Sequence, residues 1–256
     1  MRKNNLSHDS LKGIIKRHWD GRSNDYGKFR GYGSEEEKIA WMDVLSSALG
    51  TERRNVLDVG TGPGDIAIYL AEMEHDVTGI DFSDEMLKRA KGRVKNSNLQ
   101  VKFDICDAED LYFEDESFDA VICRHLLWTL PNPGKALREW TRVVKPGGKI
   151  VVIDGKWRSS SPIDRMRRLI RSLVFLVYEQ RKPPKSYKKE INGKLPFRNG
   201  AEPEKVVELF NDLELVNVSA QDITTVREAQ RRNMPWLYRR IWGTHPTFLM
   251  IGEKSR

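Results

Sequence analysis

The stretch from Val56 to Asp65 contains the residues whose types and spacing say most about chemistry. It reads Val-Leu-Asp-Val-Gly-Thr-Gly-Pro-Gly-Asp, so a short apolar run leads into three alternating glycines and then into a helix-like segment. Glycine is needed where the backbone takes a positive φ angle or where a ligand touches the main chain. Such a loop offers open amides and a concave floor to a bound molecule.

The spacing of these glycines distinguishes two kinds of ligand. A dinucleotide site has the pattern G-x-G-x-x-G and places a pyrophosphate at the N-terminus of the next helix. Here the pattern is G-x-G-x-G, and the carboxylates of Asp58 and Asp65 flank the turn. Two carboxylates repel a phosphate and favour a cationic ligand. The glycine spacing of the loop therefore disfavours an NAD-dependent oxidoreductase.

Two more acidic residues follow later apolar runs. Asp81 comes 21 residues after Gly60, where a carboxylate can accept hydrogen bonds from ribose hydroxyls. Asp107 follows the next apolar run and can accept a hydrogen bond from an exocyclic amine. The three features in this order indicate a site for a cation that carries a ribose.

Apolar runs of strand length alternate with segments of helix length, which is the order of a parallel sheet with crossover helices. We predict strands at 55–59, 76–80, 99–105, 120–123, 149–154, 215–223 and 246–252. We predict helices at 35–49, 66–73, 84–94, 133–144, 162–180 and 202–211. Ser34 and Ser83 are expected N-caps, and Lys145 to Gly148 are expected to stop a helix and form a turn.

The run from Val56 to Asp154 resembles the class I S-adenosylmethionine-dependent methyltransferases, most closely the small-molecule, quinone-biosynthesis-like branch (type 11). This run covers roughly two-fifths of the chain, and its matching motifs are Leu57–Gly64, Gly79–Ser83 with Met86-Leu87, Asp107–Glu109, Phe118–Val121, and Leu137–Glu139 through Val144–Gly148. The resemblance implies a doubly wound, Rossmann-like α/β fold. Its sheet would have seven strands, the last one antiparallel, with a helical lid.

By this resemblance the cofactor is S-adenosyl-L-methionine. Asp58 would lie near its amino group, Asp81 would hold both ribose hydroxyls, and Asp107 would read the adenine edge. The full set of expected cofactor-binding residues is Asp58, Gly60, Thr61, Gly62, Gly64, Asp81, Phe82, Met86, Asp107, Ala108, Arg124 and Tyr26.

The catalytic candidates are His125 and Arg124, which follow the fourth predicted strand. Ligands of open α/β sheets gather outside the carboxyl ends of the strands. His125 is expected to act as a general base or to contact the cofactor, and Arg124 to bind a carboxylate or phosphate of the acceptor. The alternative is that His125 hydrogen-bonds backbone alone. For Trp128, packing is favoured over contact with substrate.

Composition limits the remaining possibilities. The chain has 256 residues, of which 39% are apolar and 32% charged, as in a water-soluble globular protein. It lacks a run of about 20 apolar residues and a secretory signal, so we expect no membrane span and a cytoplasmic location. Cys106 and Cys123 are expected to be reduced core residues, and no spacing indicates a metal site.

The positive charge is concentrated in one segment. Residues 156–198 contain 13 Lys or Arg and three acidic residues, whereas the remaining 31 basic and 34 acidic residues nearly balance. Part of this charge lies on the predicted helix at 162–180, which also has an apolar stripe made by Ile163, Met166, Ile170, Val174 and Val177. Such a segment suits an amphiphilic or anionic small-molecule acceptor, an acidic partner or a membrane surface. An ordinary packed helix with solvated arginines is the alternative.

We therefore predict one methyltransferase domain over 1–256. It would consist of a cofactor-binding core at 50–155, lid elements at 1–45 and 157–200, and C-terminal strands at 215–252. The predicted function is methyl transfer from the cofactor to a small-molecule acceptor by in-line displacement. A basic nucleic-acid-binding or nucleic-acid-modifying protein on the same scaffold is the alternative, and no oligomeric state follows from the sequence.

Overall fold

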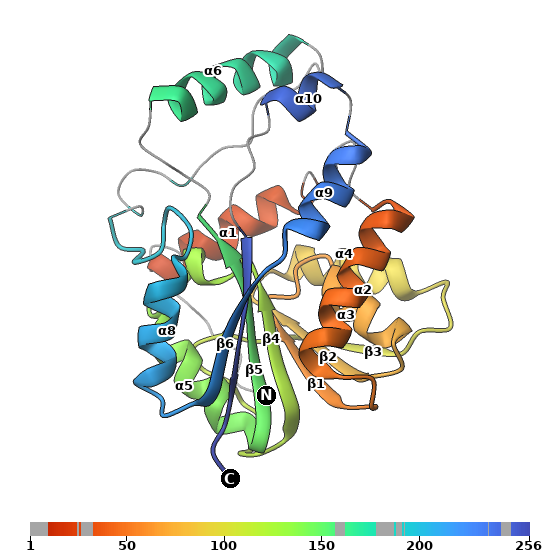
Figure 1. Ribbon diagram of the computed structural model, residues 1–256, viewed down its shortest axis with the longest axis vertical. Helices are drawn as coiled ribbons and strands as arrows, with labels where there is room; N and C mark the ends of the chain where they lie inside the picture. Colours follow the sequence, from red (N-terminus) through yellow and green to blue (C-terminus); the bar gives the residue numbers. More distant parts are fainter. Residues whose placement is uncertain are drawn as a thin grey trace.

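The computed structural model describes residues 10–24, 26, 33–156, 162–177, 187, 191, 193–234, 236–241 and 247–256. Its sheet has seven strands in the order β3-β2-β1-β4-β5-β7-β6 (Figure 1). Their bounds are β1 Asn55–Val59, β2 Asp76–Asp81, β3 Val101–Ile105, β4 Phe118–Arg124, β5 Val144–Gly155, β6 Val216–Asp222 and β7 Thr247–Glu253. Strand β7 runs antiparallel to both of its neighbours, β5 and β6, and the other pairs are parallel. The predicted fold class is confirmed.

Helices cover both faces of this sheet (Figure 1). The described helices are α1 Leu11–Arg22, α2 Glu35–Leu49, α3 Asp65–Glu72, α4 Asp84–Val94, the 3-10 helix η1 Leu127–Thr129, α5 Pro133–Val143, α6 Pro162–Val177, α8 Pro203–Asn211, α9 Thr224–Arg232 and α10 Trp236–Ile241. Helices α2, α3 and α9 pack on one face, whereas α5 and α8 pack on the other. Successive side chains of a strand point to opposite faces, so each central strand contributes to both layers.

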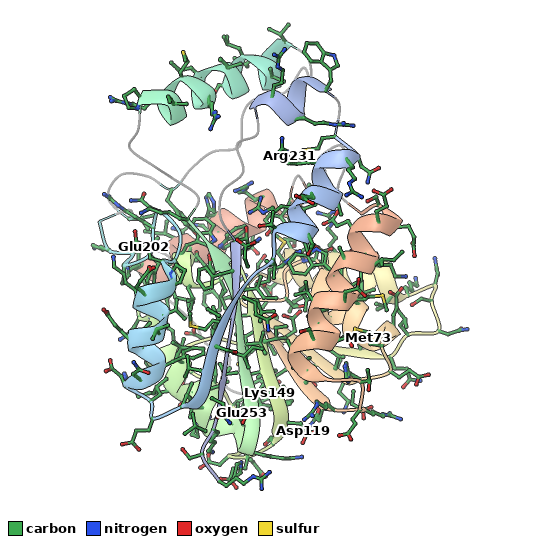
Figure 2. The ribbon with its side chains drawn as sticks, viewed as in Figure 1. Met73, Asp119, Lys149, Glu202, Arg231 and Glu253 are labelled. Carbon is green, nitrogen blue, oxygen red and sulfur yellow. The ribbon has the colours of Figure 1, made fainter. Side chains whose placement is uncertain are left out.

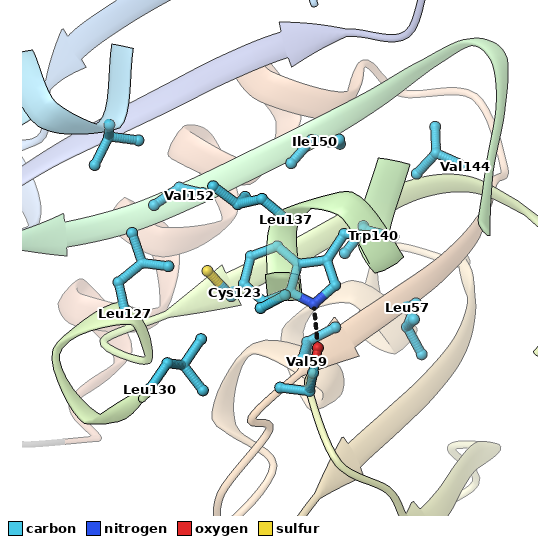
Figure 3. Packing of buried hydrophobic residues seen from close by; sticks show 14 of the residues in the cluster. Leu57, Val59, Cys123, Leu127, Leu130, Leu137, Trp140, Val144, Ile150 and Val152 are labelled. Carbon is cyan, nitrogen blue, oxygen red and sulfur yellow. Dashed lines mark hydrogen bonds between the residues drawn. The ribbon is translucent and has the colours of Figure 1, made fainter. Parts of the chain in front are cut away.

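Trp140 of α5 lies at the centre of the layer shown in Figure 3. Its indole is fully buried among Leu57, Val59, Cys123 and Val152. Its Nε1 donates a hydrogen bond of 3.0 Å to the backbone oxygen of Ala108. The core is thereby connected directly to the loop that follows β3, which forms part of the site described below.

The predicted N-caps are confirmed. Ser34 Oγ accepts a hydrogen bond from Glu37 N at 3.2 Å, and Ser83 Oγ accepts one from Met86 N at 3.2 Å. Each hydroxyl satisfies one of the free amides of a first helical turn. The starts of α2 and α4 are therefore set by local sequence.

The stretch from Lys145 to Gly148 ends α5 as predicted, but it does not form a turn before the next strand. It belongs to β5, which begins at Val144. The reason is pairing with the C-terminal tail: Gly147 N donates to Lys254 O at 2.8 Å, and Lys254 N donates to Gly148 O at 2.9 Å. A contact between residues this far apart in the chain leaves no local signal.

Two observations bear on the expected lid elements. Helix α2, most of which we assigned to the lid, buries Trp41, Leu45 and Leu49 against the sheet and belongs to the core. Helix α6 contributes no side chain to the pocket described below, as far as its described residues show. The predicted end of that helix, at 178–180, lies outside the described residues, as does Trp157.

Candidate active site

A pocket opens at the carboxyl ends of β1, β2 and β4, beside the loop after β3. Its empty volume is about 920 Å³, part of which is open solvent at its mouth. All of the predicted cofactor-binding residues except Gly64 line it, and both catalytic candidates line it as well. The structure thus brings together residues that the sequence places up to about 100 positions apart.

The glycine loop after β1 forms the floor of this pocket. Gly60 and Gly62 have φ angles of 69° and 55°, in the left-handed region that favours glycine. A Cβ on Gly62 would meet nothing within 4 Å, so its main chain is open to a ligand. Gly64 serves packing instead, because a Cβ there would lie 3.1 Å from Ala90 and 3.3 Å from Phe103.

Asp81 connects the glycine loop to the start of α4. Its Oδ2 accepts a hydrogen bond from Gly62 N at 2.9 Å, and its Oδ1 accepts one from Ser83 N at 2.8 Å. Burial nevertheless raises the pKa of Asp81 to about 6, because desolvation of the carboxylate outweighs these amides. Hydrogen-bond donors of a bound ligand would favour the ionised form of Asp81.

Asp58 lies at the end of β1 and is 1% exposed. Thr61 Oγ1 donates a hydrogen bond of 2.6 Å to its Oδ2. Burial raises the pKa of Asp58 to about 6, although the hydrogen bond from Thr61 and the charge of Arg124 act in the opposite direction. Two desolvated carboxylates in one pocket therefore fit a cationic ligand with hydroxyl donors.

Asp65 does not line the pocket. The expectation that its carboxylate, together with that of Asp58, would repel a pyrophosphate is therefore wrong for Asp65. Its carboxylate accepts from Arg124 Nη2 at 2.7 Å and from Arg93 Nη1 at 2.5 Å. Burial alone would raise the pKa of Asp65, but the two guanidinium groups outweigh it and hold that pKa below its ordinary value. At the glycine loop, the carboxylates that line the pocket and would repel a phosphate are Asp58 and Asp81.

The same contacts define the position of Arg124. Its guanidinium pairs with Asp65 and stacks over the ring of Trp41, with 5.2 Å between the guanidinium carbon and the ring centroid. It also lines the pocket. Arg124 thus connects the first turn of α3 and the core helix α2 to the end of β4.

His125 has a φ angle of 56°, which is uncommon for a residue other than glycine. Its backbone N donates to Ile153 O at 2.8 Å, and the residue borders the pocket. Burial, with further contributions from Arg124 and Arg227, lowers the pKa of His125 well below its ordinary value. The imidazole is therefore neutral at physiological pH, and its strained backbone is a feature found at functional sites.

The loop after β3 carries Asp107, Ala108 and Glu109. Lys12 of α1 reaches into it, with its Nζ 2.6 Å from Asp107 Oδ2 and 2.7 Å from Glu109 Oε2. Although burial opposes the charge, hydrogen bonds to these two carboxylates raise the pKa of Lys12. An N-terminal cation thus pairs with the carboxylate that we expected to read adenine, and this contact was not predicted.

Helix α1 covers one side of the pocket with Lys12, Ile15 and Trp19. Tyr26 lines the pocket as well, its ring centroid 5.6 Å from that of Trp19. Sequence reasoning missed this helix, although its apolar and aromatic residues recur at helical spacing: Leu11, Ile14, Ile15, His18 and Trp19. Ser10 is its N-cap, with Oγ accepting from Gly13 N at 3.1 Å.

Residues of the segment 187–195 pack against α1. Tyr187, Ile191 and Leu195 form a cluster with Ile15, and Trp128 of η1 packs against it with 5.6 Å between its ring centroid and that of Tyr187. Thr129 Oγ1, which lines the pocket, hydrogen-bonds the Tyr187 hydroxyl and accepts from Trp19 Nε1 at 3.2 Å. Trp128 therefore packs, as favoured, and this part of the predicted lid adjoins the pocket.

Other kinds of site find no support within the described ranges. They contain no group of three or more His, Cys, Asp or Glu that could hold a metal ion. Cys106 and Cys123 are free and buried. None of the helices in the described part of the chain has the length and apolar character required to cross a bilayer.

The comparisons with known proteins agree with this geometry. A family profile described as "Methyltransferase domain" matches residues 57–152. The ubiquinone/menaquinone biosynthesis C-methyltransferase UbiE of Rickettsia felis is 37% identical over 122 residues, 44% of this chain and 49% of that protein. The chain thus spans about half the length of the UbiE proteins that it matches. The phosphatidylethanolamine N-methyltransferase of Cereibacter sphaeroides is 35% identical over 155 residues, 59% of this chain and 76% of that protein.

The chain belongs to the class I S-adenosylmethionine-dependent methyltransferases. Among solved structures, phosphoethanolamine N-methyltransferase 2 of Haemonchus contortus, in complex with phosphomonomethylethanolamine and S-adenosylhomocysteine, superposes with a TM-score of 0.60. That match has 19% identity and covers 98% of this chain and 58% of the other chain, so it supports the fold alone. The relatives named here carry small-molecule names and give the nucleic-acid alternative no support.

The pocket residues fit the cofactor of this family. The open main chain at Gly62, the ribose-position carboxylate of Asp81 and the buried carboxylate of Asp58 surround one space. A ligand with a positive charge and ribose hydroxyls would compensate the desolvation that raises both pKa values. S-adenosyl-L-methionine has both features.

Proposed function

We propose that this methyltransferase transfers the methyl group of S-adenosyl-L-methionine to an amphiphilic or anionic small molecule. The observation that carries the proposal is the conjunction of Asp58, Gly62 and Asp81 around one pocket in a chain of this family. When bound, the cofactor supplies a methyl group on a positively charged sulfur. We propose that it is held by the eleven predicted cofactor-binding residues that line the pocket, whereas Gly64 supports the loop by packing.

The proposed acceptor class follows from the rest of the lining. Apolar side chains outside the cofactor set share the pocket, among them Ile15, Trp19, Leu126, Leu130 and Pro131. The names of both relatives refer to molecules with large apolar parts, a phospholipid in one case and ubiquinone and menaquinone in the other. An acceptor with an apolar part would gain about 25 cal/mol per Å² that it buries here.

Alignment of donor and acceptor is the main catalytic contribution that we propose. Holding two reactants in line can supply about 7–11 kcal/mol of a barrier. His125 is neutral at physiological pH, so it can accept a proton, but its strongly lowered pKa makes it a weak base. We assign it the position beside the reacting atoms, and we assign Arg124 the role of holding the β4 end against α3 through Asp65.

A cytoplasmic location is also proposed, in agreement with two free thiols.

The direct test combines binding with product detection. Calorimetric titration is expected to show binding of S-adenosylmethionine and S-adenosylhomocysteine, and no binding of NAD. Label from methyl-labelled cofactor should then enter the organic phase of a cell extract incubated with the protein. Cofactor binding with label confined to the aqueous phase would contradict an amphiphilic acceptor, and binding without incorporation into either phase would contradict the transferase activity.

A variant of His125 tests its role. Asparagine tolerates a positive φ angle, so His125→Asn changes the side chain and preserves the local backbone. We expect turnover to fall by about 10²-fold or more, with an unchanged melting temperature and cofactor affinity. The measurement is kcat across pH together with calorimetric titration. A kcat and a pH profile equal to those of the wild type would remove His125 from the catalytic set.

A further inference from the structure

Helix α6 presents an uncovered apolar stripe. Seven of its large apolar side chains are exposed, between 41% for Ile170 and 76% for Val177. They lie at the i, i+3, i+4 and i+7 spacing that places side chains on one face of a helix, as the members Ile163, Met166, Ile170, Leu173 and Val177 show. An apolar face of this length normally packs against another part of the protein. Here it faces outward.

The neighbouring helix α10 extends the same surface. The two helices are in contact, and Figure 1 shows them side by side at the end of the molecule toward which the parallel strands run. Trp236 of α10 is 69% exposed. Tryptophan is enriched at membrane interfaces because its ring is apolar and its N–H can remain hydrated. The apolar surface thus combines aliphatic groups with an interfacial aromatic group.

The charge on this end of the molecule is positive. Helices α6 and α10 together contain six arginines and a single acidic residue, Asp164. Arg165, Arg167 and Arg240 are exposed, and Arg232 adds another exposed guanidinium at the end of α9. Figure 2 shows the neighbouring Arg231 on the side of α9 that faces α10. Exposed arginines on the same helices as an apolar stripe complement an anionic surface that has an apolar interior.

We propose that α6 and α10 form a docking surface for an anionic phospholipid bilayer. The apolar stripe enters the boundary between headgroups and acyl chains, while the arginines pair with lipid phosphates. This binding does not depend on the proposed methyl transfer, and it is measured without turnover. Because the same end of the molecule carries the pocket, docking would bring the pocket mouth near the bilayer.

The test is flotation of the full chain with vesicles, at low and high salt. Wild-type protein is expected to float with equimolar phosphatidylcholine and phosphatidylglycerol, and much less with phosphatidylcholine alone or at high salt. Leu169→Glu combined with Leu173→Glu should reduce binding by about tenfold or more, because both leucines are exposed on the stripe. Arg165→Gln with Arg167→Gln should reduce it by about fivefold per arginine on the anionic vesicles.

A matched control distinguishes binding through this surface from nonspecific binding of exposed apolar residues to vesicles. Ile39→Glu with Val216→Glu replaces two exposed aliphatic residues elsewhere, 53% and 45% exposed, with the same change of charge. This control should float like the wild type, and all variants should retain their circular dichroism and cofactor affinity. The proposal is overturned if the wild type fails to float, or if the stripe variant floats as well as the control. It is also overturned if sedimentation shows a dimer that the stripe variant dissociates, because a second copy then covers the stripe.

Discussion

At the scale of single residues, the structure shows hydrogen bonds of Asp81 that the sequence does not reveal. Its position at the end of β2 predicts a ribose contact, whereas the structure adds that its two oxygens hold the amides of Gly62 and Ser83. The carboxylate therefore orders the glycine loop and the start of α4 before any ligand arrives. Preorganisation of this kind lowers the entropy lost on binding.

Replacing Asp81 should therefore affect cofactor binding strongly. We expect Asp81→Ala to raise the dissociation constant of S-adenosylmethionine by about tenfold or more, since one charged hydrogen bond contributes about 1.5–3 kcal/mol. Asp76→Ala is the matched control, because Asp76 begins the same strand and its exposed side chain pairs with Arg53. Calorimetric titration measures both. Equal affinities for the two variants would exclude Asp81 from the site.

The raised pKa values of Asp58 and Asp81 predict how binding depends on pH. Both lie at about 6, and a cationic ligand prefers the ionised carboxylates, so binding releases protons near and below that pH. Affinity should fall as pH is lowered from about 8 to about 5, by up to about tenfold per pH unit for each proton released. Titration in buffers of different ionisation enthalpy measures the proton release. A flat affinity over this range would show that neither carboxylate faces the bound cofactor.

Without cofactor, the same groups affect stability in the opposite sense. A folded pKa above the unfolded value means that the folded protein binds the proton more tightly. The stabilising contribution is then fully present below the unfolded pKa of about 4 and is lost as pH rises through about 6. Bound cofactor offsets this loss because it stabilises the ionised forms.

At the scale of elements, the sequence predicts those whose signals are local. The strand before the glycines, the N-caps Ser34 and Ser83 and the alternation of strands with helices each depend on neighbouring residues, and the structure confirms them. The extension of β5 through Lys145 to Gly148 depends on the distant C-terminal tail. Long-range pairing of this kind cannot be read from a window of sequence.

Helices α9 and α1 were not predicted, and the reason differs between them. Helix α9 has few apolar residues, so its periodicity is weak, although Val226 and Ala229 are buried. Helix α1 has a regular apolar spacing, but Gly13, Gly21 and its many polar residues weaken the helical signal. The pocket residues at strand ends were thus predicted, whereas Lys12 and Trp19 were not, because they belong to an element that we had not predicted.

Lys12 provides a test of how α1 supports the site. Its ammonium lies between Asp107 and Glu109, which are 11% and 3% exposed, so its loss leaves two neighbouring carboxylates without this cation. We expect Lys12→Met to weaken cofactor binding several-fold and to accelerate proteolytic cleavage near α1, since such a bond contributes about 1–3 kcal/mol. Lys88→Met, which removes an exposed ion pair with Glu85, is the control. Protease resistance equal to that of the control would show that α1 is held by its apolar contacts alone.

At the scale of the whole molecule, the two ends of the sheet have different roles. The loops at the carboxyl ends of the strands form the pocket, and α1, α6 and α10 gather at that end (Figure 1). Asp119, Lys149 and Glu253 mark the opposite end (Figure 2), where Lys145 pairs with Asp119 at 2.8 Å. Conserving the core while varying the loops at one end is how such folds acquire different acceptors.

The lid segment, residues 157–200, divides into two parts with different expected effects. The described residues of helix α6 do not line the cofactor pocket, whereas Tyr187, Ile191 and Leu195 pack against α1, and Phe197 belongs to the core. We expect replacement of Pro162–Val177 by a Gly-Ser linker of equal length to leave cofactor affinity within about twofold, because no described contact to the pocket is lost. Methyl transfer to an acceptor held in vesicles should decrease, since the exposed stripe is removed.

The second part of the lid segment, which packs against α1, should affect both stability and cofactor affinity. Changing Tyr187, Ile191 and Leu195 together to Ala removes the apolar support of α1, and each buried large-to-small change costs about 2–5 kcal/mol. We therefore expect this triple variant to lower both the melting temperature and the cofactor affinity, in contrast to the α6 replacement. Calorimetric titration and thermal unfolding of the two proteins provide the comparison. If the α6 replacement also loses cofactor binding, α6 belongs to the cofactor-binding core, and the division of the lid segment is wrong.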